Sequence, residues 1–287
     1  MASHPYLVGL IGAGVGPSLT PSMHMAEARE LGLTYVYRTI DLTTLGLAPT
    51  QVGELVAAAR ALGFDALNVT HPCKHLVVPH LDRLDDQAAR LGAVNTVIFE
   101  DGAAVGYNTD ASGFATAFRH GLPGAAAHDV VQLGAGGAGA AVADALLSQG
   151  LQHLTIVDVD DQRCAGLARD LAARFPAHRV DAGHPDKLSV LLPGSDGLVH
   201  CTPIGMADHP GLPLDPALLH PGLWVADIVY RPLDTALLQA ARAVGCRTLH
   251  GGHMAVHQAV DTLRLVTGVE PDAGRMLRHF QTLVAHE

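Results

Sequence analysis

The sequence has no closely spaced pair of cysteines among its 287 residues. Its four cysteines are far apart and form no C-x-x-C motif; they are Cys73, Cys164, Cys201 and Cys246. This spacing argues against a zinc knuckle and against a dense disulfide framework, so we expect buried free thiols in a reducing compartment. The first residues also lack the basic start and apolar run of a signal peptide, and the cytoplasm is therefore the expected location.

Basic residues and long apolar runs are scarce as well. Lys and Arg total 18 against 28 Asp and Glu, which gives a formal net charge of −10. This charge disfavours a general surface for nucleic acid or for an anionic membrane. No stretch approaches the roughly 20 uninterrupted apolar residues that a membrane span needs. We therefore expect no nucleic-acid or membrane partner. An anionic small molecule can still bind through local positive groups and backbone N–H groups.

Histidine is abundant, with 18 copies, but its spacing does not complete a metal site. Two pairs, His71 with His75 and His253 with His257, have the i, i+4 spacing that can hold a metal on a helix. Neither pair carries the glutamate of an H-E-x-x-H motif, and no cysteine or carboxylate cluster adds further ligands. We therefore predict no metal site, with a histidine-held metal as the alternative.

Apolar runs that suit strands alternate with helical patterns from end to end. The expected strands cover residues 7–12, 34–40, 66–70, 130–133, 154–158, 197–200, 224–228 and 247–249, and residues 95–99 and 104–107 form a hairpin. The expected helices cover residues 21–31, 51–62, 74–81, 85–91, 112–120, 161–174, 234–243, 254–266 and 272–285, and another ends near Gly150.

This rhythm predicts an α/β fold with parallel strands and helices on both faces of the sheet. Residues 121–124 (GLPG) form the best linker candidate, and a new alternation begins after them. We therefore expect two α/β domains, residues 1–120 and 121–253. The final helices, in residues 254–287, are expected to pack back on the first domain.

A glycine-rich stretch predicts a dinucleotide site in the second domain. Residues 134–139 fit G-x-G-x-x-G between an apolar strand and an alanine-rich helix. Gly134 permits the tight turn, Gly136 lets the backbone approach a pyrophosphate, and Gly139 allows close packing of helix on strand. The N–H groups at the helix start, around Gly137 and Ala138, then face the phosphates.

The residue at the end of the next strand bears on the choice of cofactor. Asp158 stands where an acidic side chain would bind both hydroxyls of an adenosine ribose and repel the 2′-phosphate of NADP, which favours NAD. Arg163 leaves NADP as the alternative, because it could swing toward a 2′-phosphate. Asp158 could instead cap the following helix, although Asp160 or Asp161 could also do so.

Polar residues stand in the first domain where apolar packing is expected, in residues 68–74, 93–96 and 108–110. The carboxyl ends of strands in α/β sheets are where ligands bind. Lys74 and Asp110 together would give a proton-transfer pair for oxidation of an alcohol, in which a proton leaves the hydroxyl as hydride leaves the carbon. Taken singly, Lys74 also suits a surface position and Asp110 a helix N-cap.

These stretches resemble the ordered motifs of the shikimate/quinate dehydrogenase family. The N-[VI]-T-x-P-x-K motif of that family matches residues 68–74, and its next two motifs match residues 93–96 (AVNT) and 106–110 (GYNTD). Residues 134–139 match its nucleotide loop. Residues 227–232 (DIVYRP) and 257–259 (HQA) resemble the two motifs near its C-terminal end. The resemblance covers nearly the whole chain.

The resemblance implies a role for each matching residue. Lys74 and Asp110 would be the catalytic pair. The ring hydroxyls of the substrate would be bound by Asn95, Thr70 and Gln258, and its carboxylate by Ser18 and Thr20, which could equally form an ordinary helix N-cap. The residues that would line the nicotinamide side are Thr202, Ile204, Gly205, Met206, Val229 and Gly251.

Two departures from the NADP-dependent members resemble the NAD-dependent quinate/shikimate dehydrogenases. Thr20 replaces the second serine of S-x-S, and residues 158–160 (DVD) replace Asn-Arg-[ST]. The resemblance thus implies reversible oxidation of the C3 hydroxyl of quinate and/or shikimate, with NAD as hydride acceptor. The products would be 3-dehydroquinate and 3-dehydroshikimate, which suits catabolic use of quinate. The sequence leaves open which acid is preferred and whether the chain is a monomer or a homodimer.

Three alternatives differ in what the same residues would do. A paralogue could act on an amino-shikimate or otherwise modified shikimate. A non-enzymatic sensor could bind quinate without turning it over, although the Lys74 and Asp110 pair argues against this. A two-domain folate-type dehydrogenase ranks last, because it should lack Asn95 and the motif at residues 108–110.

Overall fold

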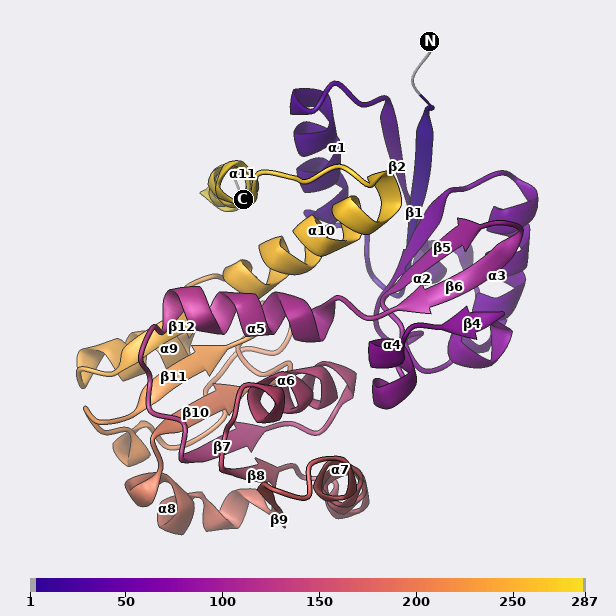
Figure 1. Ribbon diagram of the computed structural model, residues 1–287. Coiled ribbons are helices and arrows are strands. Elements are labelled where there is room, and N and C mark those ends of the chain that lie inside the picture. Colours follow the sequence, from indigo (N-terminus) through magenta and orange to yellow (C-terminus); the bar gives the residue numbers. More distant parts are fainter. Residues whose placement is uncertain (1–3, 286–287) are drawn as a thin grey trace. The chain divides into compact units, whose positions relative to one another are not determined.

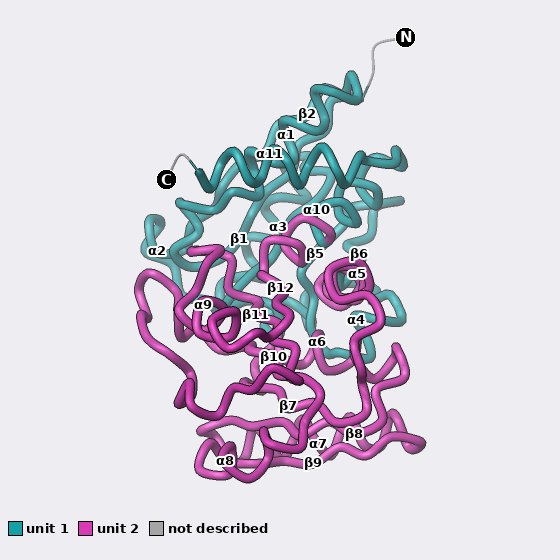
Figure 2. The backbone as a smooth tube through the Cα atoms, turned by 90° about the vertical axis from the view of Figure 1, so that its left-hand side faces the viewer, with its two compact units in different colours: residues 1–109, 258–287 teal, residues 110–257 magenta. Residues whose placement is uncertain are grey.

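The computed structural model describes residues 4–285, which form two compact units (Figures 1 and 2). Unit 1 runs to Thr109 and resumes at Gln258, and unit 2 is Asp110–His257. These two units are defined by contacts between residues. The domain limits expected after residues 120 and 253 are defined by sequence patterns, so the two divisions are not the same quantity. Those domain limits stay a prediction.

Unit 1 contains a mixed six-stranded sheet in the order β2-β1-β3-β5-β6-β4. Strand β1 pairs in parallel with β2 and β3, β5 runs antiparallel to β3 and β6, and β4 pairs in parallel with β6. The strands are β1 (Tyr6–Gly12), β2 (Tyr35–Asp41), β3 (Ala66–Val69), β4 (Arg83–Leu84), β5 (Thr96–Glu100) and β6 (Ala103–Tyr107).

Alternate residues of these strands enter different apolar clusters, as the period of two in a strand requires. In β1, Val8 and Leu10 join the cluster that includes Ala28, whereas Ile11 joins the cluster that includes Val56. The two faces of the sheet are thus packed against different helices. The helices of unit 1 are α1 (Thr20–Glu30), α2 (Leu42–Leu45), α3 (Val52–Ala61), α4 (Asp86–Leu91), α11 (Ala273–Ala285) and α10 (Gly252–Thr267), which begins in unit 2.

The hairpin expected across Asp101 and Gly102 is confirmed. Both residues have positive φ, 49° and 77°, which is the backbone that a tight two-residue turn between β5 and β6 needs. The return of the C-terminal helices to the first domain is also confirmed, since α11 packs on α1. Glu27 of α1, nearly fully buried, accepts two hydrogen bonds from the guanidinium of Arg275, at 2.6 and 2.7 Å.

Unit 2 contains a fully parallel six-stranded sheet in the order β12-β11-β10-β7-β8-β9. The order reverses between β7 and β10, as in doubly wound dinucleotide-binding domains, and this reversal is where such sheets bind ligands. The strands are β7 (Asp129–Leu133), β8 (His153–Val157), β9 (Arg179–Gly183), β10 (Gly197–His200), β11 (Trp224–Asp227) and β12 (Arg247–His250).

Helices flank this sheet, and its apolar cores form around β-branched and leucine-rich strands (Figure 1). One cluster joins Val131 and Leu133 of β7 to Leu188 of α8 and Leu237 of α9. The helices of unit 2 are α5 (Asp110–Gly121), α6 (Gly137–Ser148), α7 (Asp161–Arg174), α8 (Leu188–Leu191) and α9 (Ala236–Ala243).

One expected helix is wrong. Residues 74–81 form turns, with only a short 3₁₀ helix at Val78–His80. Pro79 explains the difference, because it has no N–H to donate to the carbonyl of His75 in an α-helical turn. Strands β9 and β4 were not expected. Residues 179–183 (RVDAG) lack a strong apolar pattern because β9 is an edge strand.

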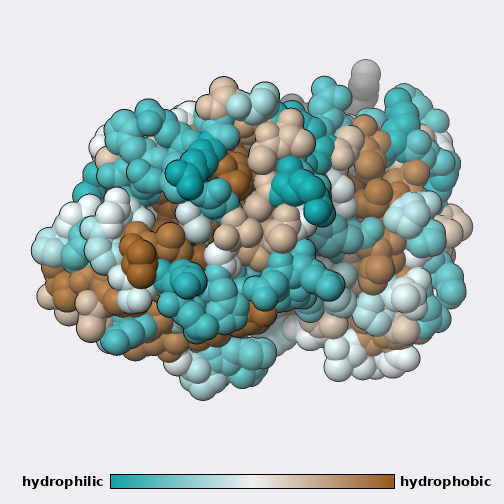
Figure 3. Space-filling view, turned by 90° about the horizontal axis from the view of Figure 1, so that it is seen from below, coloured by the Kyte–Doolittle hydropathy of each residue, from teal (hydrophilic) through white to brown (hydrophobic). Residues whose placement is uncertain are grey.

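Within the described residues, no helix is both long enough and apolar enough to cross a membrane. Hydrophobic residues on the face shown in Figure 3 lie in separate patches among hydrophilic ones. The large apolar side chains that are more than half exposed come from different elements and loops; they are Val36, Leu45, Leu62, Val159 and Val190. Single exposed residues of this kind are ordinary on a protein surface.

Candidate functional site

In unit 1, the structure brings Asn95 and Gln258 together although they are far apart in the sequence. Asn95 precedes β5 and is 3% exposed, and Gln258 lies on α10. The Nδ2 of Asn95 donates to the Oε1 of Gln258 at 3.3 Å and to the hydroxyl of Thr109 at 2.9 Å. The backbone N–H of Thr109 donates back to the Oδ1 of Asn95 at 2.8 Å. The side-chain amide of Asn95 is therefore held in one orientation, because a backbone N–H can only donate.

Thr70 and the loop after β1 lie at the same edge of the sheet as Asn95. The parallel strands β1 and β3 end side by side, and Thr70 N–H donates to the carbonyl of Ile11 at 2.9 Å. The N–H of Val69 donates to the carbonyl of Asn95 at 2.8 Å. A Cβ added at Gly12 would lie 2.4 Å from Cγ2 of Thr70, so this position requires glycine.

Ser18 and Thr20 stand at the start of α1, beyond the same end of β1. The N–H of Thr20 donates to the Oγ of Ser18 at 3.3 Å, and both residues are half-buried. Leu19 already has helical φ and ψ, so the contact of Ser18 with the N–H two residues on is that of a helix N-cap. The capping contact involves the oxygen of Ser18 as an acceptor, so both hydroxyls stay candidates for donating to a carboxylate.

A carboxylate on β2 fixes the loop that leads to these hydroxyls. Asp41 accepts the N–H groups of Gly14 at 2.9 Å and Gly16 at 3.0 Å. Burial alone would raise the pKa of Asp41, but these backbone hydrogen bonds and those of Thr43 and Thr44 outweigh it and lower that pKa. Asp41 therefore stays ionised and braces the loop. The sequence pattern gave no sign of this role.

Lys74 lies in the turn after β3 and is half-buried. Its carbonyl accepts the N–H of Val94 at 2.9 Å, which ties the Lys74 turn to the segment that carries Asn95. Cys73, beside it in sequence, is fully buried and anchors the turn in the core of unit 1. The structure thus places Lys74 on a fixed backbone within the same unit as Asn95, Thr70 and Gln258.

Asp110 opens α5 and is 5% exposed. It directly follows Thr109, whose N–H and hydroxyl both bond Asn95. Chain connectivity therefore places Asp110 one residue beyond the Asn95 contacts, although Asp110 itself is the first residue of unit 2.

The glycine-rich turn of unit 2 connects β7 to α6. Gly134 has φ of 101°, and a Cβ there would lie 2.8 Å from the carbonyl oxygen of Cys201. A Cβ at Gly139 would lie 2.3 Å from the carbonyl oxygen of Gly134, so the first turn of α6 packs closely against the turn that follows β7. By contrast, nothing lies within 4 Å of a Cβ at Gly136, which is the uncapped N-cap of α6. This side of the turn is open to a ligand, as a dinucleotide site requires, and the following amides are those of Gly137 and Ala138.

Asp158 and Arg163 contact each other and the glycine-rich turn. The Arg163 guanidinium donates to Oδ1 of Asp158 at 2.6 Å, and the N–H of Ala135 donates to Oδ2 at 2.7 Å. Burial raises the pKa of Asp158, but the hydrogen bonds from Arg163, Asp160 and Ala135 outweigh it and lower that pKa. Asp158 therefore carries a fixed negative charge at the end of β8. The cap of α7 is Asp160, whose carboxylate accepts the N–H of Arg163, so Asp158 is not the cap.

Two of the residues expected on the nicotinamide side, Thr202 and Val229, are held by a buried pair, His200 and Asp227. His200 and Asp227 are fully buried, and the Nδ1 of His200 bonds the carboxylate at 3.0 Å. The Nε2 of His200 bonds the hydroxyl of Thr202 at 2.5 Å, and Asp227 accepts the N–H of Val229 at 2.9 Å. Because an ionised carboxylate only accepts, Nδ1 carries the hydrogen of the imidazole. Sequence reasoning missed His200, for which the only signal was a histidine at the end of an apolar strand.

The other four expected residues occupy loops of unit 2. Gly205 has φ of 95°, and its neighbours Ile204 and Met206 are more than a third exposed. Gly251 is buried, and a Cβ there would lie 2.2 Å from the carbonyl oxygen of Ile228, so the backbone requires glycine. Gly251 also lines a very small cavity of about 10 Å³ in unit 2.

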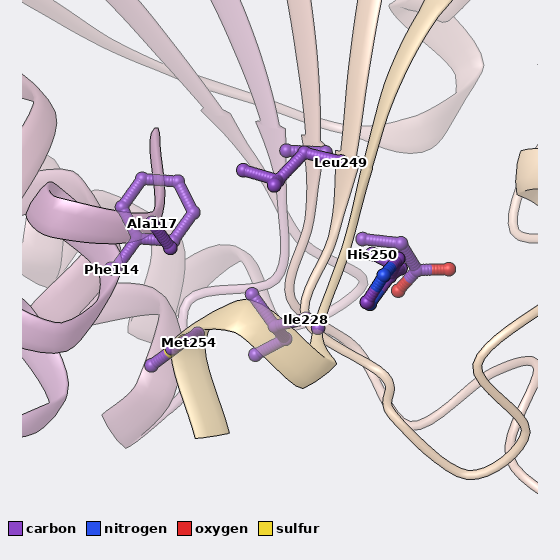
Figure 4. Close-up of a pocket in the computed structure, with 9 residues that line it drawn as sticks. Phe114, Ala117, Ile228, Leu249, His250 and Met254 are labelled. Atoms are coloured by element: carbon purple, nitrogen blue, oxygen red, sulfur yellow. The ribbon is translucent and has the colours of Figure 1, made fainter. Parts of the chain in front are cut away.

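Figure 4 shows this cavity, with Phe114 and Ala117 of α5 on one side and His250 of β12 on the other. Burial lowers the pKa of His250 to about 4, and the charge of nearby His253 adds to the effect. His250 is therefore neutral near pH 7.

The histidine pairs that suggested a metal do not gather ligands. His71 and His75 lie in the turn after β3 and not on a helix, because the expected helix there is absent. Within residues 4–285, no group of three or more His, Cys, Asp or Glu side chains is arranged to hold a metal ion.

Comparisons with known proteins follow the division into two units. Residues 10–97 match the family described as the shikimate dehydrogenase substrate binding domain. Residues 130–207 match the saccharopine dehydrogenase NADP binding domain.

Similar proteins cover almost the whole chain. The shikimate dehydrogenase (NADP(+)) of Streptomyces avermitilis is 61% identical over 277 residues, which are 96% of this chain and 95% of the relative. The quinate/shikimate dehydrogenase (NAD(+)) of Corynebacterium efficiens is 47% identical and covers 96% and 98%. Among solved structures, the quinate dehydrogenase from Corynebacterium glutamicum in complex with NAD is 45% identical, with a TM-score of 0.90 and coverage of 97% and 99%.

Proposed function

The chain belongs to the shikimate dehydrogenase family, and from this premise we propose that it oxidises the C3 hydroxyl of quinate and/or shikimate reversibly, with NAD as hydride acceptor. The observation that carries the proposal within unit 1 is the contact of Asn95 with Gln258 and Thr109. Three motifs that are distant in sequence thereby supply polar groups to one place.

The carboxylate of Asp158 supports NAD over NADP. Relatives carry names with either cofactor, so overall similarity does not decide the choice. Asp158 holds its negative charge at the end of β8, and a 2′-phosphate there would meet charge repulsion. Arg163, which could otherwise favour NADP, is already paired with that carboxylate. NADP remains the alternative cofactor.

The turn between β7 and α6 fits the pyrophosphate of a dinucleotide, because its open side exposes uncapped amides. NAD, when bound, supplies the acceptor for the hydride that leaves C3. The turn residues Gly134, Gly136, Gly137, Ala138 and Gly139 hold the cofactor. Thr202, Ile204, Gly205, Met206, Val229 and Gly251 line its nicotinamide side, and the buried bonds of His200 and Asp227 hold Thr202 and Val229 in place.

The residues of the first domain bind the acid and move its proton. Oxidation of the alcohol releases one proton from the C3 hydroxyl, and Lys74 and Asp110 form the pair that takes it. Ser18 and Thr20 donate hydroxyl hydrogens to the carboxylate of the substrate, which needs no cation in this acidic chain. Thr70, Asn95 and Gln258 bind its ring hydroxyls.

The location and domain roles are part of the same proposal. Residues 1–120 bind the substrate, residues 121–253 bind NAD, and the helices after residue 253 return to the substrate domain. All four cysteines are free thiols, which supports a reducing compartment, the cytoplasm. The chain acts as a monomer or a homodimer.

The test is the initial rate of absorbance change at 340 nm, with quinate and shikimate each offered with NAD and with NADP. Reduction of NAD by either acid, at a higher kcat/KM than reduction of NADP, is the expected result. Folded protein that is silent in all four mixtures contradicts the proposal. The Lys74→Ala variant is the control for a contaminating dehydrogenase, because a contaminant would keep its rate.

A further inference from the structure

Thr262 occupies the centre of the polar contacts beneath Asn95. It lies on α10, one helical turn after Gln258, and is fully buried. Its hydroxyl is 3.2 Å from the Oγ1 of Thr96 and 3.3 Å from the Oγ1 of Thr109. The Nδ2 of Asn68 lies 3.5 Å away. All of these residues belong to unit 1.

The directions of these hydrogen bonds follow from the donors available. The backbone N–H of Thr109 fixes Oδ1 of Asn95 as the acceptor, and the hydroxyl of Thr96 donates to that same oxygen at 3.1 Å. The hydrogen of Thr96 is thereby used, so Thr96 accepts from Thr262. Thr109 accepts from the Nδ2 of Asn95 and has its own hydrogen to donate to Thr262.

The result is a closed ring of four hydrogen bonds. It runs from the Nδ2 of Asn95 to Thr109, then to Thr262, to Thr96 and back to the Oδ1 of Asn95. In such a ring every hydroxyl donates once and accepts once, and each bond polarises the next. Asn68 joins from outside by donating to Thr96 at 3.0 Å.

The ring also sets the orientation of Gln258. Asn95 donates to the Oε1 of Gln258, so the amide NH₂ of Gln258 points away from Asn95. Residues four apart lie on the same face of a helix, so Thr262 and Gln258 face the same sheet edge. The ring therefore fixes α10 at the turn that carries Gln258.

We propose that Thr262 is a positioning residue, which closes this ring and so holds Asn95 and Gln258 in the geometry that binds the ring hydroxyls of the substrate. The inference rests on the proposed function, in which Asn95 and Gln258 bind those hydroxyls. Thr267, on the same helix, shows the ordinary alternative, because its hydroxyl donates to the carbonyl of Leu263 at 2.7 Å.

The test compares three variants. Thr262→Val replaces the hydroxyl by a methyl group of similar size and opens the ring. Thr262→Ser keeps the hydroxyl, and Thr267→Val removes a hydroxyl of the same helix that lies outside the ring. Steady-state kinetics with quinate and shikimate at saturating NAD would give KM and kcat for each acid, and the KM for NAD would be measured separately.

We expect Thr262→Val to raise the KM for the acid about tenfold, which corresponds to the loss of about one net hydrogen bond or slightly more. The KM for NAD should stay within about twofold of the parent value, because the residues proposed to bind NAD do not contact Thr262. Thr262→Ser should restore most of the affinity for the acid, and Thr267→Val should match the parent protein. A KM for the acid that is unchanged in Thr262→Val, or one that rises equally in Thr267→Val, overturns the proposal.

Hydrogen–deuterium exchange separates this inference from the proposed function. If the parent protein oxidises neither acid, the proposed function fails, while exchange still reports on the ring. Peptides that cover residues 252–267 should exchange at least about tenfold faster in Thr262→Val than in the parent, since opening of α10 becomes easier. Equal exchange in the two proteins would show that Thr262 does not hold α10, and the inference would be abandoned.

Discussion

Replacing Asp158 by alanine separates its two roles, bracing the glycine-rich turn and selecting the cofactor. The carboxylate accepts the N–H of Ala135, the N–H of Asp160 and the guanidinium of Arg163. An ionised carboxylate offers about four acceptor positions, so about one is left for a ribose hydroxyl. The sequence suggested that Asp158 binds both hydroxyls, whereas these contacts leave room for about one.

The magnitudes follow from these contacts. The N–H of Ala135 is buried, and leaving it without an acceptor costs about 1–3 kcal/mol of the free energy of unfolding. Arg163 is half exposed and returns to water, so its lost ion pair adds little. One hydrogen bond from a ribose hydroxyl to a charged group contributes about 1.5–3 kcal/mol, which is about 10-fold to 100-fold in binding. We therefore expect the ratio of kcat/KM with NAD to kcat/KM with NADP to fall at least about tenfold.

The assay measures that ratio for the parent, Asp158→Ala and Asp160→Ala, with urea unfolding of each. Asp160 is the matched control, because it is the neighbouring carboxylate and caps α7. Its loss should cost about 1 kcal/mol of stability as an N-cap and leave the cofactor ratio within about twofold. An unchanged ratio in Asp158→Ala, or an equal fall in Asp160→Ala, would refute a ribose contact through Asp158.

Three other variants test the chemistry and the buried groups. Lys74→Ala should lower turnover at least about a hundredfold while NAD affinity, measured by fluorescence titration, stays the same; near-normal turnover would remove Lys74 from the mechanism. Asp227→Ala leaves His200, Thr235 and Val229 without their buried acceptor, and urea unfolding should show a loss of about 3–5 kcal/mol, whereas a loss below 1 kcal/mol would contradict the network. Burial lowers the pKa of His24 to about 3, so the unfolded chain binds the extra proton first and stability falls as pH drops from about 6.5 toward 3. His24→Asn should reduce the slope of the free energy of unfolding against pH, between about pH 3 and 6.5, by up to about 1.4 kcal/mol per pH unit. An identical slope in the two proteins would show that burial does not lower the pKa of His24.

Most of the fold could be predicted from sequence because its elements are marked by strong local signals. The helix at residues 161–174 and the strand at 197–200 match the expected limits, since a capping aspartate opens the first and an apolar run defines the second. The hairpin was predictable because Asp101-Gly102 specifies its turn. The helix expected at residues 74–81 does not form because Pro79 interrupts its apolar spacing, and β9 has no clear pattern because an edge strand needs few apolar residues.

The site was predictable where a motif is contiguous, and not where its geometry depends on distant partners. The residues of the glycine-rich turn adopt the expected strand-turn-helix arrangement, because the glycines of the motif permit its local backbone conformation. By contrast, Asp41 and Thr262 gave no sequence signal, and the only signal for His200 was its place at the end of an apolar strand. Each acts through a hydrogen bond to a residue at least 27 positions away in the sequence. Its role therefore depends on how distant strands are aligned.

Thr262 shows why the register of the strands matters more than the residue type for side chains that act through distant partners. A threonine on an amphipathic helix is compatible with a buried core position, a bond to its own helix or a contact with another element. The antiparallel pairing of β5 with β3 and β6 decides among these. It aligns Asn68 with Thr96 and Thr96 with Tyr107, so the chain before Thr96 and the chain after Tyr107 meet at one edge. A shift of one residue in either pairing would turn Thr96 to the opposite face and break the ring. The position of Gln258, although it stands in a recognisable motif, therefore depends on the pairing of strands more than 150 residues earlier in the chain.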